Sequence, residues 1–326
     1  MKKIALLIAA AIAASVFGFS GCKKERETLD VYMPDGAPAL ALGLPMYEDG
    51  ADDGVEYHVV SATAVHTYVT GKEPKADVCV LPVNLAAKLL GAGDVYKLAG
   101  VVTHGNMYFL SSDGVVYHQQ NVSLLIGKTV GVVQLDNVPG LTLKAALGRL
   151  GIAYNDLSNG ASPREDAINL RAANPAALTG GDLYMLPSPE ADWRVANTDL
   201  EFAGSLQELY GGENGYPQAV IVVKNSVLEK DSAWVQQLLS TIERTPEWLQ
   251  TAEKSVIANT VKAHLTKGLT AKFTAETLTD AAIARSGISL QRMDGGAVAT
   301  VESFLQEIVQ IDASKAAIPS QGFYWM

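Results

Sequence analysis

Residues of the types that carry catalytic chemistry are present, but they do not form an enzyme motif. Gly127-Lys128-Thr129 ends like a phosphate-binding loop, yet Val122 stands where the first glycine of that loop belongs, and the Lys-Thr pair opens a β-type run. The sequence contains no G-x-S-x-G, H-E-x-x-H or C-x-x-C motif. These observations favour a binding protein over an enzyme, with no catalytic residues.

Histidine and cysteine are placed without the spacing of metal ligands, so we expect no metal site and no cofactor. The histidines are His58, His66, His104, His118 and His264. Cys79 lies in the apolar run 78–81 and is expected to be a buried small hydrophobic residue instead of a nucleophile. The other cysteine is Cys22.

The first 21 residues have the layout of a secretory signal peptide. Lys2 and Lys3 precede an uncharged apolar run from Ile4 to Phe19. This run is shorter than the ~20 residues of a membrane-spanning helix, and it ends in small residues instead of a basic flank. We therefore expect residues 1–21 to be removed on export.

Cys22 follows Phe19-Ser20-Gly21, and these four residues resemble the lipobox of bacterial lipoproteins, with Phe19 where Leu is usual. The resemblance implies that Cys22 is acylated and anchors the chain to the cell membrane, facing the periplasm or the extracellular side. Residues 22–28 then form a polar tether, and no intramolecular disulfide remains available. The alternative is ordinary cleavage that leaves Cys22 as a free thiol.

Composition and charge set limits on the fold and on the partners. Hydrophobic residues make up 48 % and charged residues 18 %, which favours a folded chain with a large core over a disordered one. The formal net charge is −10 and becomes more negative once Lys2 and Lys3 are removed. Such a chain repels nucleic acid. After residue 21 the chain is about twice the length of a typical domain, which favours two lobes.

Short β-type runs alternate with helical stretches, as is typical of an α/β fold with parallel strands. The expected strands are residues 29–33, 56–60, 78–81, 129–133, 182–186 and 219–223. The expected helices are 39–46, 85–90, 141–150, 165–173, a stretch from Thr274 to Gly287, and 298–308. Thr245-Pro246 indicates a kink or a fresh helix start. The aromatic tail, 323–325, is expected to cover an apolar patch.

Four segments together resemble ABC-transporter substrate-binding lipoproteins, and in particular the NMT1/THI5-like group, which includes carriers of nitrate, sulfonates, taurine and thiamine-pyrimidine precursors. The segments are 32–41, 76–86, 126–132 and 216–224. The resemblance implies a type II periplasmic-binding-protein fold, with two Rossmann-like lobes joined by a hinge of two crossover strands near 107–110 and 220–223. It implies a first lobe of 29–108 plus 222–326 and a second lobe of 109–221.

The resemblance also places a ligand site at the carboxyl ends of strands in both lobes. The residues it implies are Asp35, Gly36, Ala37, Ala62, Thr63, Asn84 and Leu85 in the first lobe, and Asn137, Val138, Pro139, Gly140 and Ser188 in the second. Ser188 stands where Glu is frequent in this group, and Glu190 is two residues away. Four aromatic residues are candidate stacking partners: Tyr108, Tyr184, Trp193 and Tyr216.

The loops of this site, 34–39, 61–64, 82–85 and 134–140, contain no Lys or Arg. A doubly charged anion normally recruits such residues, so we expect a small neutral or weakly charged organic ligand. Heteroaromatic compounds belong to this class. The ligand is expected to bind both lobes and to favour their closed arrangement.

The expected function is solute capture for an ABC importer, with its permease and ATPase subunits as partners. One alternative is a two-lobed sensor or scaffold lipoprotein without a transport role. A second is a pyrimidine synthase of the same broad group. That enzyme class carries a cysteine-rich iron-binding motif, which this chain, with Cys79 as its one internal cysteine, lacks.

Overall fold

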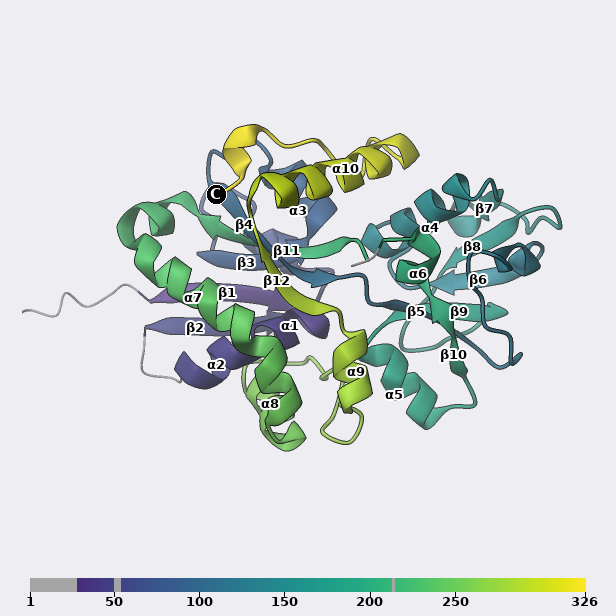
Figure 1. Ribbon diagram of the computed structural model, residues 1–326, viewed down its shortest axis with the longest axis horizontal. Helices are drawn as coiled ribbons and strands as arrows, with labels where there is room; N and C mark the ends of the chain where they lie inside the picture. Colours follow the sequence, from purple (N-terminus) through teal and green to yellow (C-terminus); the bar gives the residue numbers. More distant parts are fainter. Residues whose placement is uncertain (1–27, 50–53, 213–214) are drawn as a thin grey trace, which may run out of the picture.

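The computed structural model describes residues 28–49, 54–212 and 215–326, so the signal segment and Cys22 lie outside the described residues. Figure 1 shows two lobes side by side, each built on its own β-sheet. In the first lobe the strand order is β12-β4-β11-β3-β1-β2, and in the second it is β10-β5-β9-β6-β8-β7. The two-lobed α/β fold expected from the sequence is confirmed.

The strands of the first sheet are β1 (Leu29–Pro34), β2 (Val55–Val60), β3 (Val78–Pro82), β4 (Tyr96–His104), β11 (Pro217–Lys224) and β12 (Ile288–Arg292). Those of the second are β5 (Met107–Ser111), β6 (Thr129–Val132), β7 (Tyr154–Asp156), β8 (Ile168–Ala172), β9 (Leu183–Pro187) and β10 (Glu201–Ser205). In the first sheet β3, β1 and β2 run parallel, and in the second β9, β6, β8 and β7 do, as expected. The strands that follow a crossing between the lobes, β5 and β11, pair antiparallel with their neighbours.

The helices of the first lobe are α1 (Ala37–Ala41), α2 (Gly43–Asp49), α3 (Val83–Leu90), α7 (Asn225–Thr251), α8 (Lys254–Ala263), α9 (Asp280–Arg285) and α10 (Gly295–Ile311). Those of the second lobe are α4 (Val138–Arg149), α5 (Glu190–Asn197) and α6 (Leu206–Tyr210). Short 3₁₀ turns lie at Val65–Tyr68, Val122–Leu125, Leu157–Asn159 and Gln321–Phe323. No helix among the described residues has both the length and the apolar character needed to cross a membrane.

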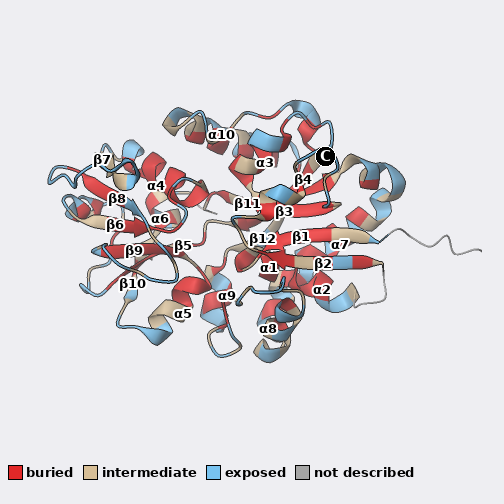
Figure 2. Ribbon diagram, turned by 180° about the vertical axis from the view of Figure 1, so that it is seen from behind, coloured by how far each residue is buried: buried red, intermediate tan, exposed pale blue. Residues whose placement is uncertain are grey.

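Helices cover both faces of the first sheet, and the sheets are buried between them (Figure 2). α7 packs on α2 and on β12, β11 and β4, whereas α3 and α10 pack against β11 on the other face. The run 220–223 in β11 is fully buried between β3 and β4, as its continuous apolar character predicts. The core therefore fixes the strand ends from which the loops of the site emerge.

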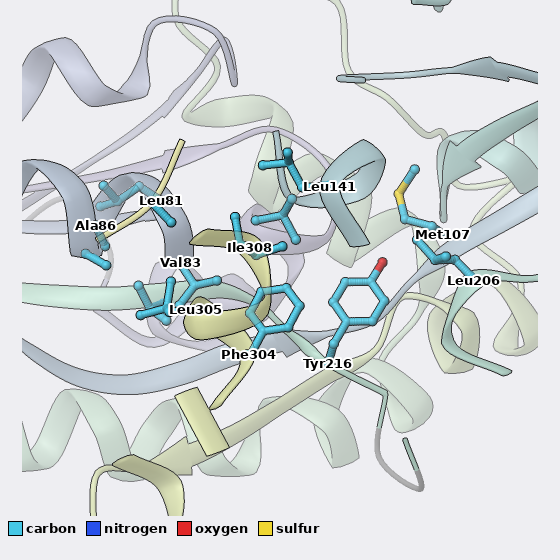
Figure 3. Packing of buried hydrophobic residues seen from close by; sticks show 14 of the residues in the cluster. Leu81, Val83, Ala86, Met107, Leu141, Leu206, Tyr216, Phe304, Leu305 and Ile308 are labelled. Carbon is cyan, nitrogen blue, oxygen red and sulfur yellow. The ribbon is translucent and has the colours of Figure 1, made fainter. Parts of the chain in front are cut away.

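One apolar cluster continues from the first lobe into the second (Figure 3). Phe304 of α10 stacks on Tyr216, with ring centroids 5.7 Å apart, and both side chains are almost completely buried. α10 also packs against α4 of the second lobe. Tyr216, one of the candidate stacking partners of the ligand, thus lies in the core.

The described C-terminal tail covers an apolar patch of the first lobe, as expected. Phe323 and Tyr324 are buried, and the Trp325 amide donates to the Leu98 carbonyl at 2.9 Å. Cys79 is fully buried in β3, and burial raises the pKa of its thiol. Both observations agree with a structural role for these residues.

Three sequence predictions about helices are wrong. Residues 165–173 do not form a helix, because Ile168 and Leu170 are buried in β8, which pairs parallel with β6 and β7. α7 runs through Pro246 without a break, and its non-helical backbone lies at Asp231 instead. The helix expected from Thr274 begins only at Asp280, where the Thr279 side chain accepts from the Ala282 amide.

Candidate ligand-binding cleft

A cavity of about 560 Å³ lies between the two lobes, where strands of both sheets end. Its first-lobe wall includes the segments 34–38 after β1 and 61–63 after β2. Its second-lobe wall includes 133–134 after β6 and 187–190 after β9. These are carboxyl ends of parallel strands, the edge at which open α/β sheets bind ligands.

Two backbone conformations shape the walls of this cavity. Gly36 has φ +98°, which glycine adopts without steric cost and which lets the chain turn from β1 into α1. Gln134 has φ +57° and is the only non-glycine residue in the described part of the chain with a positive φ. Such a conformation costs free energy at most residues and often occurs at functional sites.

Eight of the residues implied by the sequence resemblance line the cavity: Asp35, Gly36, Ala37, Ala62, Thr63, Val138, Pro139 and Ser188. Glu190, noted as a neighbouring carboxylate, also lines it. They come from both lobes, as the resemblance implies.

The structure does not bring the other four into the cavity wall, namely Asn84, Leu85, Asn137 and Gly140, nor the stacking candidates Tyr108 and Tyr216. Asn84 is 1 % exposed, and its amide donates to the Lys315 carbonyl at 3.0 Å, which ties α3 to the chain after α10. Asn137 caps α4, since its side-chain oxygen accepts from the Val138 amide at 2.9 Å. Both side chains thus make hydrogen bonds that support the fold.

None of the four candidate stacking residues lines the cavity. Tyr108 packs edge-on against Phe202, and Trp193 lies under the Arg194 guanidinium. No aromatic side chain is present among the described lining residues. The apolar part of the wall consists largely of prolines, namely Pro34, Pro38, Pro82, Pro139, Pro175, Pro187 and Pro189.

Sequence reasoning missed several polar residues of the wall: Thr103, Asn106, Gln134, Thr270, Gln218 and Lys272. Thr103 and Gln218 lie in β4 and β11, which neighbour each other in the first sheet although they are far apart in the sequence. Lys272 lies between α8 and α9, a segment that no strand-end pattern marks. A search for polar residues near the crossings between the lobes could have found Asn106.

Among the described residues, three charged side chains line the cavity, and they are linked. The carboxylate of Asp35 accepts from the Gly36 amide at 2.7 Å and from the Lys272 amide at 2.9 Å. Burial raises the pKa of Asp35, while these hydrogen bonds and the charge of Lys272 oppose that rise. The Lys272 ammonium lies 3.3 Å from the carboxylate of Glu190.

Next to the cavity, α5 of the second lobe contacts α9. Arg285 donates through Nε to Asp192 at 2.8 Å, and the Ser188 hydroxyl lies within hydrogen-bonding distance of Asp192 and, at 3.1 Å, of the Ala282 carbonyl. The side chain of Asp192 is 6 % exposed. This contact joins the two lobes on one side of the cavity.

Two further features lie outside this cavity. A larger hollow of about 790 Å³ is lined by residues such as His104, Gln207 and Ser289, but by none of the residues that the resemblance implied. On β1 and β2, Asp30, Glu56 and His58 come close enough to share an ion, although the histidines show no metal-ligand spacing in the sequence. His58 already pairs with Asp30 at 2.7 Å, and we assign no metal role to this group.

No family model and no curated protein matches this sequence. Solved structures do match it. An ABC transporter protein from Parabacteroides distasonis is 18 % identical, with 92 % of this chain and 99 % of that chain covered and a TM-score of 0.66. The periplasmic aliphatic sulphonate binding protein SsuA from Escherichia coli is 14 % identical, with 92 % of each chain covered and a TM-score of 0.65.

The periplasmic nitrate-binding protein NrtA from Synechocystis is 11 % identical, with 88 % of this chain and 82 % of that chain covered and a TM-score of 0.59. At these identities the likeness shows the fold and not the ligand. The chain has the two-lobed fold of ABC-transporter substrate-binding proteins, as the resemblance in its sequence implies.

Proposed function

We propose that this chain is the extracytoplasmic solute-binding component of an ABC importer, which captures a small organic ligand between its lobes and delivers it to a permease. The observation that carries the proposal is the cavity of about 560 Å³ at the strand ends of both lobes. Its volume suits a small molecule and is too small for a macromolecule. The solved structures of the same fold, which are described as an ABC transporter protein and as solute-binding proteins, support the proposal.

Ligand capture in this proposal depends on movement of the lobes. The chain leaves β4 at His104 and enters β5 at Met107, and it returns between Tyr210 and Pro217. The lobe boundaries expected from the sequence, 108/109 and 221/222, fall inside β5 and β11. We therefore propose these two connections between the sheets as the hinge and as the lobe boundaries. A ligand that contacts both lobes binds the closed arrangement more tightly, and this difference in affinity shifts the equilibrium.

The proposal includes anchoring through Cys22, on the lipobox-like sequence that precedes it. Residues 22–28 then separate the membrane from β1, which begins at Leu29. A Cys22→Ala variant should move from the membrane fraction to the soluble fraction, and the intact mass of the wild-type protein should include a diacylglyceryl group. A membrane-bound Cys22→Ala variant contradicts the anchor without affecting the proposed ligand site.

A thermal-shift screen of small metabolites tests the binding function. A ligand present at about 100 times its Kd adds about 2.7 kcal/mol to the free energy of unfolding. Thr63 lines the cavity and is exposed, so Thr63→Trp should fill the cavity and abolish the shift. Thr251→Trp, at an exposed position of α7 away from the cavity, is the matched control. Equal shifts in wild type and Thr63→Trp contradict the proposed site.

A further inference from the structure

Proline reduces the number of free backbone donors in two of the helices that begin at the cavity, α1 and α4. Helix N-termini bind anions through free N–H groups, and proline has none. α4 carries Pro139 in its first turn, and the Val138 amide is already bonded to Asn137. α1 likewise carries Pro38 in its first turn, whereas Pro189 is the N-cap of α5 and leaves the N–H groups of that first turn in place. The first turns of α1 and α4 therefore offer fewer free donors to an oxoanion than a helix start without proline.

Carboxylates occupy the places where an anion would bind. Asp35 accepts from the Gly36 amide at the start of α1, and Glu190 is the first residue of α5. Lys272 is the only cation among the described lining residues, and it pairs with Glu190 at 3.3 Å. One cation thus faces two carboxylates, which leaves the cavity with an excess of negative charge.

A chain of amide hydrogen bonds fixes the orientation of Gln218. The Ser188 carbonyl can only accept, so Asn106 must turn its Nδ2 toward it, at 3.1 Å. Asn106 Oδ1 then faces Gln218 and accepts from its Nε2 at 2.6 Å. The remaining atom, Gln218 Oε1, is a buried acceptor without a hydrogen-bond partner.

Thr103, beside Gln218 in the wall, has a second unpaired polar atom. Its hydroxyl is buried without a partner, and the whole residue is 1 % exposed. Buried polar groups without partners are rare in folded proteins and are costly. A ligand that carries hydrogen-bond donors would satisfy Gln218 Oε1, and it could also pair with the Thr103 hydroxyl.

We propose that the ligand is a small organic cation with N–H donors, an amine or an amidine, and that the cavity rejects oxoanions such as nitrate and sulfonates. The proposal rests on the proposed function, because it concerns the same cavity. Asp35 supplies the charge that the cation pairs with, Gln218 Oε1 accepts one of its N–H groups, and the prolines contact its carbon skeleton.

Charge-matched compounds test this inference. The processed chain is titrated calorimetrically with pairs of similar size and opposite charge that share a phenyl ring or a four-carbon chain: benzamidine and benzoate, butylamine and butanesulfonate, agmatine and adipate, with nitrate added. We expect binding only among the cationic members. Binding of the anionic members alone, or of both members equally, overturns the inference and leaves the proposed function standing. Binding of no compound in this panel overturns the inference, while the wider metabolite screen decides the proposed function separately.

Variants of the cavity test the same inference with a cationic binder. Asp35→Asn keeps the shape and removes the charge, and it should weaken binding about tenfold or more. Glu190→Gln, in the other lobe, should also weaken the binding of the cation. Asp199→Asn, an exposed position outside the cavity, is the matched control and should bind as wild type does. Unchanged affinity in both cavity variants overturns the inference.

Discussion

Lys272 and Glu190 form an ion pair between the two lobes, with Nζ 3.3 Å from Oε2. Glu190 is the less exposed partner, at 11 % against 39 % for Lys272. Removing the ammonium leaves two carboxylates in the cavity. We therefore expect Lys272→Gln to raise the affinity for a cationic ligand by a few-fold, opposite to the effect of Glu190→Gln.

Calorimetry at low salt and at about 0.5 M salt checks this prediction, because screening should reduce the difference between Lys272→Gln and wild type. Lys262→Gln, in the last turn of α8 and outside the cavity, is the control. If Lys272→Gln weakens binding at both salt concentrations, the lysine contacts the ligand directly and the electrostatic explanation fails.

Protonation of Asp35 should weaken the binding of a cation. Burial raises the pKa of Asp35, so the loss of its charge begins at a higher pH than for a free carboxyl; Lys272, which lowers this pKa, and Glu190, which raises it, are the charged groups that act on it. We expect the affinity to fall as the pH is lowered from about 7 toward 4. Calorimetric titrations of the cationic ligand at several pH values in this range check the prediction.

The Asp35→Asn variant separates this effect from other titrations. Its affinity should be low and nearly independent of pH in the same range. The stability of the ligand-free chain should change with pH in the opposite direction to the ligand affinity. Because the folded-state pKa of Asp35 is raised, its contribution to the free energy of unfolding increases as the pH falls through that pKa. A wild-type affinity that rises on acidification contradicts the role of Asp35.

Tyr216→Phe should stabilise the protein and leave ligand binding unchanged. The Tyr216 ring is fully buried against Phe304, and its hydroxyl is buried without a hydrogen-bond partner. Removing that hydroxyl relieves a desolvation cost while the ring contacts remain, so we expect a gain of about 1 kcal/mol in the free energy of unfolding. Urea unfolding measures it. A loss of stability, or a change in affinity, contradicts the core role of Tyr216.

Asp192→Asn should destabilise the contact between α5 and α9. The variant keeps the shape but removes the charge that Arg285 and Ser188 contact. Hydrogen bonds to charged groups contribute about 1.5–3 kcal/mol, and Arg285 is 30 % exposed, so we expect a loss of about 2 kcal/mol. Asp199→Asn should change the free energy of unfolding by less than about 0.5 kcal/mol. Equal stability of the two variants in urea contradicts this prediction.

The sequence predicts the parallel strands and the strand-end loops well because local signals mark them. Strands such as 78–81 and 219–223 are apolar runs bounded by turns, and they are found where expected. The helix predicted for 165–173 is wrong because the alternating apolar residues of this run suit a strand as well as a helix. Pairing with β6 and β7 in the sheet determines that the run forms a strand. Parallel pairing is a tertiary interaction that periodicity does not encode.

The site is harder to predict, because its polar residues come from distant segments. Asp35 and Gly36 directly follow a strand, and the resemblance finds them. Gln218 and Lys272 line the same cavity only because the chain crosses twice between the lobes. Asn84 also follows a strand, but its amide is used by the Lys315 carbonyl, a contact over 231 residues that no local pattern reveals.

Amide hydrogen exchange of the processed chain, with and without a bound ligand, tests most directly the claim that the ligand binds between the lobes. We expect slower exchange in segments of both lobes that line the cavity, namely 35–37 and 61–63 in the first and 133–134 and 188–190 in the second. The segment 283–291, beside the larger hollow, should exchange as before. Slower exchange confined to one lobe, or centred on 283–291, contradicts the claim.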